Sequence, residues 1–250
     1  MNLLRCTICL IGLGVGAPST QWLSAQSVSP PIAEYQERAR SSFQLQNASI
    51  FPITVVLEVR GFTITDHGDV VDVPLDTNRV HVKLSEMSFR LAPRATHTVF
   101  YEATSDSLPT WFNILSAMSG ARTSTGLNVR ILLPHVVYLN QKQPLRREEV
   151  AINGFEYDPV AKKAWVELEN SGPHLGRVQQ VTMSDGRNTS EPGGGFPLLP
   201  HRRRRALVNW DGASPPSRLN LRFTRFNIDT TFTPVPASLA ADTAAGTPRP

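Results

Sequence analysis

Hydrophobic and polar positions alternate along residues 126–139 (GLNVRILLPHVVYL). A period of two is typical of a β-strand, because successive side chains of a strand point to opposite faces. The stretch contains several β-branched valines and has no glycine after Gly126, which also favours strand over helix. The apolar side chains that share one face in its first half are Leu127, Val129, Ile131 and Leu133.

Pro134 lies inside this predicted strand. Proline has no backbone N–H, so within sheets it is confined to edge strands, bulges or bends. A long apolar edge strand invites another chain to pair with it. The stretch therefore predicts an edge that binds other polypeptide chains, and an ordinary core strand is the simpler alternative.

Further short alternating runs, separated by turn residues, fill the first part of the chain. They predict strands within residues 40–47, 53–59, 80–84, 89–91, 96–102 and 111–118, after an extended segment around Pro30-Pro31. Seven or eight short strands in about 115 residues, with a turn every 8–12 residues, are typical of an immunoglobulin-like β-sandwich. We therefore predict such a domain over residues 26–141.

A polar segment at residues 142–149 interrupts this pattern and predicts a hinge between two domains. Alternation then resumes within residues 155–157, 164–170, 178–183, 206–210 and 219–223. This predicts a second, smaller sandwich over residues 150–232. The expected fold class is all-β, with two immunoglobulin-like sandwich domains.

The first 25 residues have the three parts of a secretory signal peptide. Arg5 precedes an apolar run that is too short to span a bilayer, and Leu23-Ser24-Ala25, which ends in two small residues, follows as the cleavage site. We expect cleavage before Gln26 and export of the remaining chain.

Both cysteines of the chain, Cys6 and Cys9, lie in this leader. The exported chain would contain no cysteine, so its cores must be stable without a disulfide. No later stretch is long and apolar enough to span a membrane. Residues 233–250, rich in proline, alanine and threonine, are predicted to be disordered.

Charged residues and potential ligands form no recognisable catalytic or metal site in the sequence. Residues 202–205 are four consecutive arginines without interleaved aromatic residues, which indicates a solvated loop or strand edge rather than a surface for nucleic acid or another anionic partner. The six histidines are far apart, and no nucleophile motif is present. We therefore expect no enzymatic activity, no metal and no cofactor. A solvated hairpin, rather than a calcium loop, is expected around Asp66, Asp69, Asp72 and Asp76.

Taken in order, several segments resemble the PapD-like periplasmic chaperones of pilus assembly. The similarity lies in the order and spacing of the segments over nearly the whole exported chain, since no single motif is specific. In the first domain these are Val28-Ser29-Pro30, residues 43–49, Leu108-Pro109 and residues 130–137, with Ser85, Phe89, Leu91, Pro93 and Val99. In the second domain they are residues 166–172 and Leu199-Pro200.

This resemblance implies two domains in an L-shaped arrangement and a periplasmic chaperone. Such a chaperone lends its edge strand to a pilin-like subunit that lacks one strand of its own, for delivery to an outer-membrane usher. Alternate side chains of the lent strand fill the groove of the subunit, so the expected client-binding residues are Leu127, Val129, Ile131 and Leu133. The same edge would allow a self-capping dimer. Nothing in the resemblance implies nucleic acid, membrane insertion or a cofactor.

The sequence departs from this family at two points. Leu108-Pro109 lacks the Arg-Glu-Ser continuation that is usual in the family, and the family's anchor for the subunit is missing. Better-known members carry one basic residue in the first strand and another in the donor strand, and this pair holds the C-terminal carboxylate of the subunit. The corresponding positions here are Ile32 and either Pro134 or His135. The basic pair is therefore missing, and each charge-assisted hydrogen bond that it would make is worth about 1.5–3 kcal/mol. Arg130 and His135 are the candidates for a substitute anchor.

Two other functions are compatible with the sequence. A secreted two-domain adhesion or binding module would use its loops rather than its edge strand. A secreted enzyme is the third hypothesis, and the missing catalytic residues argue against it. An edge strand covered on both sides by this chain itself would exclude the chaperone hypothesis.

Overall fold

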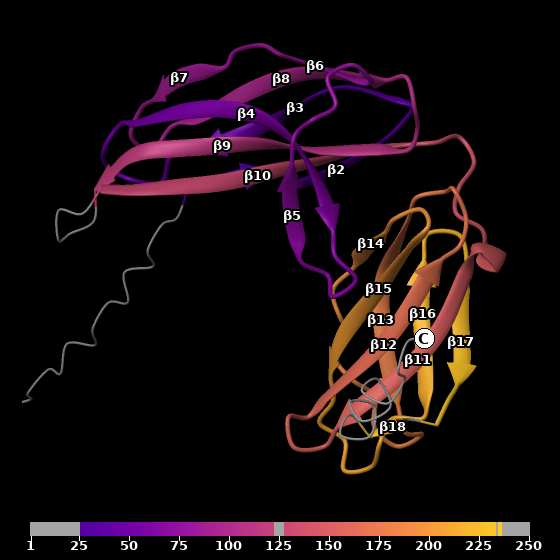
Figure 1. Ribbon diagram of the computed structural model, residues 1–250. Helices are drawn as coiled ribbons and strands as arrows, with labels where there is room; N and C mark the ends of the chain where they lie inside the picture. Colours follow the sequence, from indigo (N-terminus) through magenta and orange to yellow (C-terminus); the bar gives the residue numbers. More distant parts are fainter. Residues whose placement is uncertain (1–25, 123–127, 234, 237–250) are drawn as a thin grey trace, which may run out of the picture.

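The computed structural model describes residues 26–122, 128–233 and 235–236. These residues fold into two β-sandwiches joined by a short linker, and no α-helix occurs among them. They accordingly contain no helix that could span a membrane. The first sandwich lies across one end of the second, so that the molecule is L-shaped (Figure 1). The predicted all-β class with two immunoglobulin-like sandwiches is confirmed.

The first sandwich contains two sheets, with strand orders β1-β3-β8-β6 and β2-β10-β9-β4-β5. The strands of the first sheet are β1 (Ser27–Ser29), β3 (Arg38–Gln46), β8 (Thr96–Ser105) and β6 (Val80–Leu84). Those of the second sheet are β2 (Ile32–Gln36), β10 (Asn128–Asn140), β9 (Thr110–Arg122), β4 (Ile53–Ile64) and β5 (Val70–Val73), and β7 (Ser88–Leu91) pairs with β4. The second sheet is the layer that faces the second domain (Figure 1).

Side chains that alternate inward form the core of this sandwich, as their period of two predicts. Phe43 and Leu45 of β3 pack in one cluster with Ile53, Val55 and Leu57 of β4, and each is at most 2% exposed. Full burial of such a side chain stabilises the fold by about 1.5–3 kcal/mol. Because residues 26–250 contain no cysteine, this packing holds the described sandwich together without a disulfide.

The second sandwich also has two sheets, with strand orders β15-β12-β11-β18 and β14-β13-β16-β17. The strands are β11 (Val150–Asp158), β12 (Lys163–Asn170), β13 (Gly176–Ser184), β14 (Phe196–Leu198), β15 (Arg202–Asn209), β16 (Arg218–Phe223), β17 (Asn227–Thr231) and β18 (Val235–Pro236). β18 pairs with residues 156–157 of β11, so the sheet continues beyond Phe232, the predicted end of this domain. The predicted signal peptide and residues 237–250 lie outside the described residues.

The linker between the sandwiches is fixed by a buried carboxylate. Residues 141–146 lead into a short 3₁₀ helix, η1 (Arg147–Glu149). The Glu149 side chain is 6% exposed, accepts a hydrogen bond from the backbone N–H of Arg146 at 2.9 Å and lies 2.6 Å from Nδ1 of His174. Burial raises the pKa of Glu149, but the hydrogen bonds from Arg146 and His174 outweigh burial and lower it overall. Gly172 is required beside this carboxylate, because a Cβ there would lie 2.5 Å from its Cδ.

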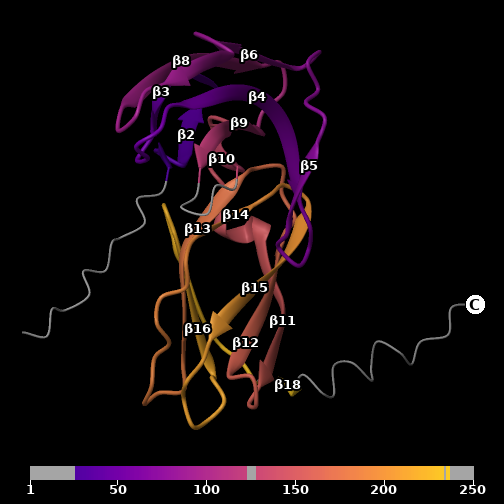
Figure 2. The same cartoon turned by 90° about the vertical axis from the view of Figure 1, so that its left-hand side faces the viewer.

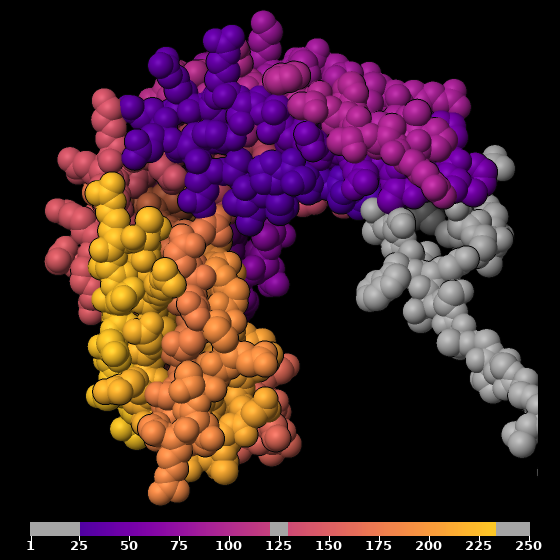
Figure 3. Space-filling model, turned by 180° about the vertical axis from the view of Figure 1, so that it is seen from behind, coloured from indigo at the N-terminus to yellow at the C-terminus, as the bar shows by residue number. Residues whose placement is uncertain are grey.

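An apolar cluster joins the two domains at the hinge. Its buried members are Phe62, Ile64 and Tyr138 of the first domain with Leu175 and Leu199 of the second. Seen from behind, the atoms of the two domains meet at this corner and leave an open angle on one side (Figure 3). The hairpin of β4 and β5 descends from the first domain along β15 (Figure 2). The second domain is therefore held at two places, by the apolar cluster and by this hairpin.

Candidate functional site

β10 is fully paired on one edge and only partly paired on the other. It pairs antiparallel with β9 along residues 128–139. On its second edge, β2 pairs in parallel with residues 136–140 only. Within the part of the chain that the structure describes, no strand pairs with this second edge over residues 128–134. β10 is therefore an interior strand near the hinge and an open edge near the tip of the first domain (Figure 1).

Side chains of β10 divide between two faces at this open edge. Ile131 and Leu133 point to the core of the first sandwich, yet both are only half-buried. Leu132 and Pro134 point to the opposite face and are exposed, Leu132 to 57%. The structure therefore brings two of the four predicted client-binding residues together on one face of an open edge.

The outer end of this open edge is marked by a β-bulge. The register between β10 and β9 shifts by one residue between Val129 and Ile131. Gly120 of β9 has φ +94° at this point, a left-handed conformation that glycine adopts without a Cβ clash. Of the other two predicted residues, Leu127 lies outside the described residues, and only the backbone of Val129 is described.

Pro134 lies where the open edge gives way to the pairing with β2. Val136 donates its backbone N–H to the Pro31 carbonyl at 2.8 Å, on the β2 side. Backbone groups of every second residue point to the same edge of a strand, so the missing N–H of Pro134 falls on the open edge. A proline there is the arrangement that the sequence predicts for an edge strand. Leu132 then presents both its N–H and its C=O to an incoming strand.

His135 follows at once and is completely buried. Its Nδ1 lies 2.7 Å from the Pro30 carbonyl, and because a carbonyl can only accept, Nδ1 carries the proton. Nε2 lies 3.0 Å from the Tyr101 hydroxyl, and the ring stacks on Phe43 with 4.6 Å between the centroids. Burial lowers the pKa of His135, partly offset by the hydrogen bond to Pro30. The neutral ring thereby ties β10 to the crossover between β1 and β2.

This geometry argues against His135 as a substitute anchor for a carboxylate, since both nitrogens are engaged and neither is exposed. Ile32, at the first-strand position of the family anchor, pairs with Val136 and is 45% exposed. Arg130 is exposed and belongs to the first residues of β10 (Asn128–Asn140), and this end of the strand lies away from the second domain (Figure 1). A role for Arg130 as an anchor stays a prediction.

At the hinge, the second domain points one basic side chain, Arg177, at the first domain. Arg177 of β13 is 14% exposed, forms an ion pair with Glu34 of β2 and places its guanidinium 5.0 Å from the ring centroid of Tyr138. Burial raises the pKa of Tyr138, and the nearby charge of Arg177 opposes this effect. The side chain of Gln141 adds hydrogen bonds to the backbone N–H and C=O of Leu175. These residues of both domains line a hollow of about 210 Å³. The charge of Arg177 in it is already paired with Glu34, so we assign the hollow to the contact between the domains.

A second contact between the domains covers part of the free edge of β15. The backbone N–H of Arg205 donates to the Asp66 carbonyl at 2.7 Å. Gly68, at φ +97°, lies against Arg204, and a Cβ there would be 3.0 Å from the guanidinium carbon. That guanidinium lies 5.2 Å from the ring centroid of Phe196, and burial lowers the pKa of Arg204. Residues 202–205, interpreted from sequence as a loop or strand edge, are the start of edge strand β15.

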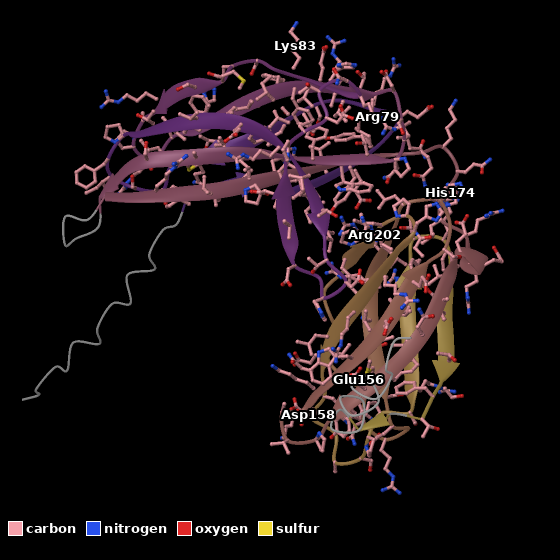
Figure 4. The ribbon with its side chains drawn as sticks, in the orientation of Figure 1. Arg79, Lys83, Glu156, Asp158, His174 and Arg202 are labelled. Carbon is pink, nitrogen blue, oxygen red and sulfur yellow. The ribbon has the colours of Figure 1, made fainter. Side chains whose placement is uncertain are left out.

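Polar side chains elsewhere do not assemble into a metal centre. Among residues 26–122, 128–233 and 235–236, no three His, Cys, Asp or Glu side chains are placed to hold a metal ion. Arg202 lies at the end of the second domain that faces the first, whereas Glu156 and Asp158 lie toward the far end (Figure 4). The open edge of β10 can pair with a strand of another chain, and this pairing would bury the apolar side chains of β10.

The sequence matches no protein-family profile and no curated protein. Among solved structures, the fold is similar to a chain in the complex of Salmonella enterica SafA pilin with the SafB chaperone, at 12% identity and a TM-score of 0.52 over 84% of this chain and 97% of that one. The class 5 fimbriae chaperone CfaA matches at 10% identity and a TM-score of 0.49, over 84% of this chain and 100% of its own. A chain in the CsuC–CsuE chaperone–tip adhesion subunit complex of Acinetobacter baumannii matches at 9% identity and 0.48, over 82% and 98%. The similarity to the SafA–SafB complex shows a shared two-sandwich fold.

Proposed function

We propose that this chain is a divergent PapD-like periplasmic chaperone that holds a pilin-like subunit on the open edge of β10 and delivers it to an outer-membrane usher. The observation that carries the proposal is the missing partner strand beside residues 128–134 in the described structure. A soluble protein normally protects such an edge, because it pairs readily with other chains. The resemblance in sequence and the fold shared with a chain of the SafA pilin–SafB chaperone complex support this class of client, and the predicted signal peptide supports the compartment.

The proposed binding step needs no cofactor, nucleotide or bond-making chemistry. A strand of the subunit pairs with the free edge, taking hydrogen bonds from and to the backbone of Leu132. Ile131 and Leu133 fill the groove left by the strand that the subunit lacks. Completing the burial of these two half-buried side chains contributes at most about 3–6 kcal/mol, before the cost of ordering the partners. In this proposal the chain is a binding protein and not an enzyme.

Co-expression in the periplasm with a pilin-like subunit encoded beside the gene tests the proposal. Ile131→Glu places a charge at the half-buried edge position, and we expect the subunit to be lost from the purified complex. The matched control is Phe100→Glu, because Phe100 is 62% exposed on β8 of the other sheet and is not expected to touch the subunit. Circular dichroism melts of both variants establish that each is folded. Undiminished co-purification with a folded Ile131→Glu variant would overturn the donor role.

A further inference from the structure

The outward face of the second sheet, turned away from the core of the first sandwich, is covered at one end and bare at the other. At the hinge end, Tyr138 and Trp111 lie directly opposite each other on β10 and β9, and they belong to the apolar cluster that packs against Leu175 and Leu199. Toward the tip the same face continues without cover from the second domain (Figure 1). Most of the side chains that continue this face on β9 and β10 are again apolar, and the charged Glu58, Arg60 and Arg130 lie at their margin.

Strand register places these apolar side chains in adjacent rows. Leu132 of β10 lies opposite Ala117 of β9, which in turn lies opposite Val56 of β4. Leu132 is 57% and Val56 47% exposed. The next row holds Pro134 and Leu115, and Ile32 lies beside Val136 in the row nearest the hinge. We name the six residues Ile32, Val56, Leu115, Ala117, Leu132 and Pro134 the bare face.

Two features indicate that the bare face is a contact surface. Single exposed apolar side chains are ordinary, but a contiguous group on one sheet face marks an interaction site. Of the nearest charges, Glu58 and Arg60 pair with each other at 2.8 Å, and Arg130 lies on the same face of β10, two residues before Leu132. The bare face is also continuous with the open edge, because Leu132 and Pro134 belong to both.

We infer that the bare face seats the body of the same subunit whose groove receives the edge of β10. This inference rests on the proposed function and extends it. A subunit strand paired beside Leu132 brings the flanking surface of that subunit against Leu132 and Pro134, and from there toward Ala117 and Val56. The partner is thus a subunit with an apolar strip next to its groove. The subunit is held through both faces of β10, with Ile131 and Leu133 on one side and Leu132 on the other.

Val56 provides the sharpest test, because it lies on β4, two strands away from the edge. A subunit bound through the edge alone would not reach it. With the co-expressed pilin-like subunit as probe, we expect Val56→Glu and Val56→Lys each to lower its affinity at least about tenfold. Phe100→Glu on the other sheet is the control and leaves the affinity unchanged. The two variants introduce opposite charges, so an electrostatic interaction with Glu58 or Arg60 cannot explain a loss of affinity in both.

The outcomes separate this inference from the proposed function. If Ile131→Glu abolishes binding while both folded Val56 variants bind normally, the edge alone holds the subunit and the bare face has no such role. If a folded Ile131→Glu variant still binds, the proposed function fails and this inference fails with it. Hydroxyl-radical footprinting of the unaltered chain gives a readout that does not depend on folding of a variant. Protection of Val56 and Leu132 in the complex supports the inference, whereas a Val56 that is oxidised as fast in the complex as in the free chain overturns it.

Discussion

β10 of the first domain and β15 of the second both run along a sheet edge that lacks a complete partner, but their side chains differ in kind. Over residues 130–134, β10 carries Ile131, Leu132, Leu133 and Pro134 after a single arginine. β15 begins with four arginines, residues 202–205. Its edge also receives the Asp66 carbonyl from the tip of the β4–β5 hairpin. The first edge is apolar and open, and the second is charged and partly covered.

The charge on β15 includes one that points inward. Ala206 and Val208 are buried in the core, and Arg204 shares their face of the strand because it lies two residues before Ala206. Charged side chains on an edge strand, inward-pointing charges and a covering loop are the common ways in which soluble proteins prevent edge-to-edge pairing. The same chain therefore protects one edge and leaves the other unprotected. This contrast favours a binding role for β10 over an accidental exposure.

Giving β10 the protection that β15 has is expected to produce the largest effect. The double variant Ile131→Lys with Leu133→Lys should lower affinity for the co-expressed subunit by more than about 100-fold, because two apolar contacts are lost and two charges are desolvated. Isothermal titration calorimetry with the purified pilin-like subunit measures the change. Leu207→Lys, at a residue of β15 that is 49% exposed, is the matched control and should leave affinity unaltered. If the folded double variant binds the subunit within about threefold of the affinity of the unaltered chain, the open edge of β10 is not the binding site.

The sequence predicts the open strand because the relevant signals are local. Alternation along residues 126–139 gives the two faces of β10, and the missing N–H of Pro134 indicates an edge. The division of the outward face into covered and bare parts is not local, since it depends on Leu175 and Leu199 of the other domain. The predicted client-binding set accordingly contains Ile131 and Leu133 but not the exposed Leu132 between them.

Two other features depend on contacts that are distant in the chain. The position of His135 is set by Pro30, 105 residues earlier, and by Tyr101, so its spacing in the sequence gave no sign of burial. Strand β5 escaped prediction because all four of its residues, Val70–Val73, are exposed and its sequence has no alternation. The sequence predicts a solvated hairpin around Asp66, but nothing local indicates that this hairpin reaches β15.

Removing the inward charge of β15 is expected to have the next largest effect. Nε and Nη1 of Arg204 are buried without a hydrogen-bond partner among the described residues. Arg204→Met removes these unsatisfied donors, so the free energy of unfolding should rise by about 1–3 kcal/mol. The variant should also self-associate more at high concentration, because the edge has lost an inward charge. Urea unfolding and light scattering measure the two changes.

Arg203 provides the control for this variant. It lies on the outward side of β15, forms ion pairs with Glu167 and Glu169 and is 57% exposed. Arg203→Met should change stability by less than about 0.5 kcal/mol, as is usual for a surface substitution. A loss of stability on Arg204→Met would show that the guanidinium contributes more to packing on Phe196 and Gly68 than its unsatisfied donors cost.

Restoring the missing N–H on the open edge of β10 should have a smaller effect. Pro134→Val adds one donor to the edge that Leu132 already presents, and one further hydrogen bond is worth about 0.5–1.5 kcal/mol. We expect the subunit to bind about two- to tenfold more tightly, and the free chain to self-associate more. Calorimetry and light scattering measure both. Pro93→Val, outside the β10 edge, is the control, and equal affinities of all three chains would show that pairing does not extend to residue 134.

The smallest expected effect concerns His135, which holds the inner limit of the open edge. Burial lowers the pKa of His135 in the folded chain, while the unfolded value is about 6.5. As the pH falls through the unfolded value, the unfolded chain binds the proton first, so stability that is present above this pH is lost on acidification. Between pH 7.5 and 5.5, a loss of about 1 kcal/mol would lower the melting temperature by about 2–4 °C. Glu149, whose pKa is lowered, loses its contribution to stability only at more acidic pH, below about 4.3.

His135→Phe keeps an aromatic ring on Phe43 and should remove the part of the pH dependence that comes from His135 in calorimetric melts. Equal slopes in the two proteins would mean that the β1–β2 crossover, and with it the length of the open edge, does not depend on a neutral His135.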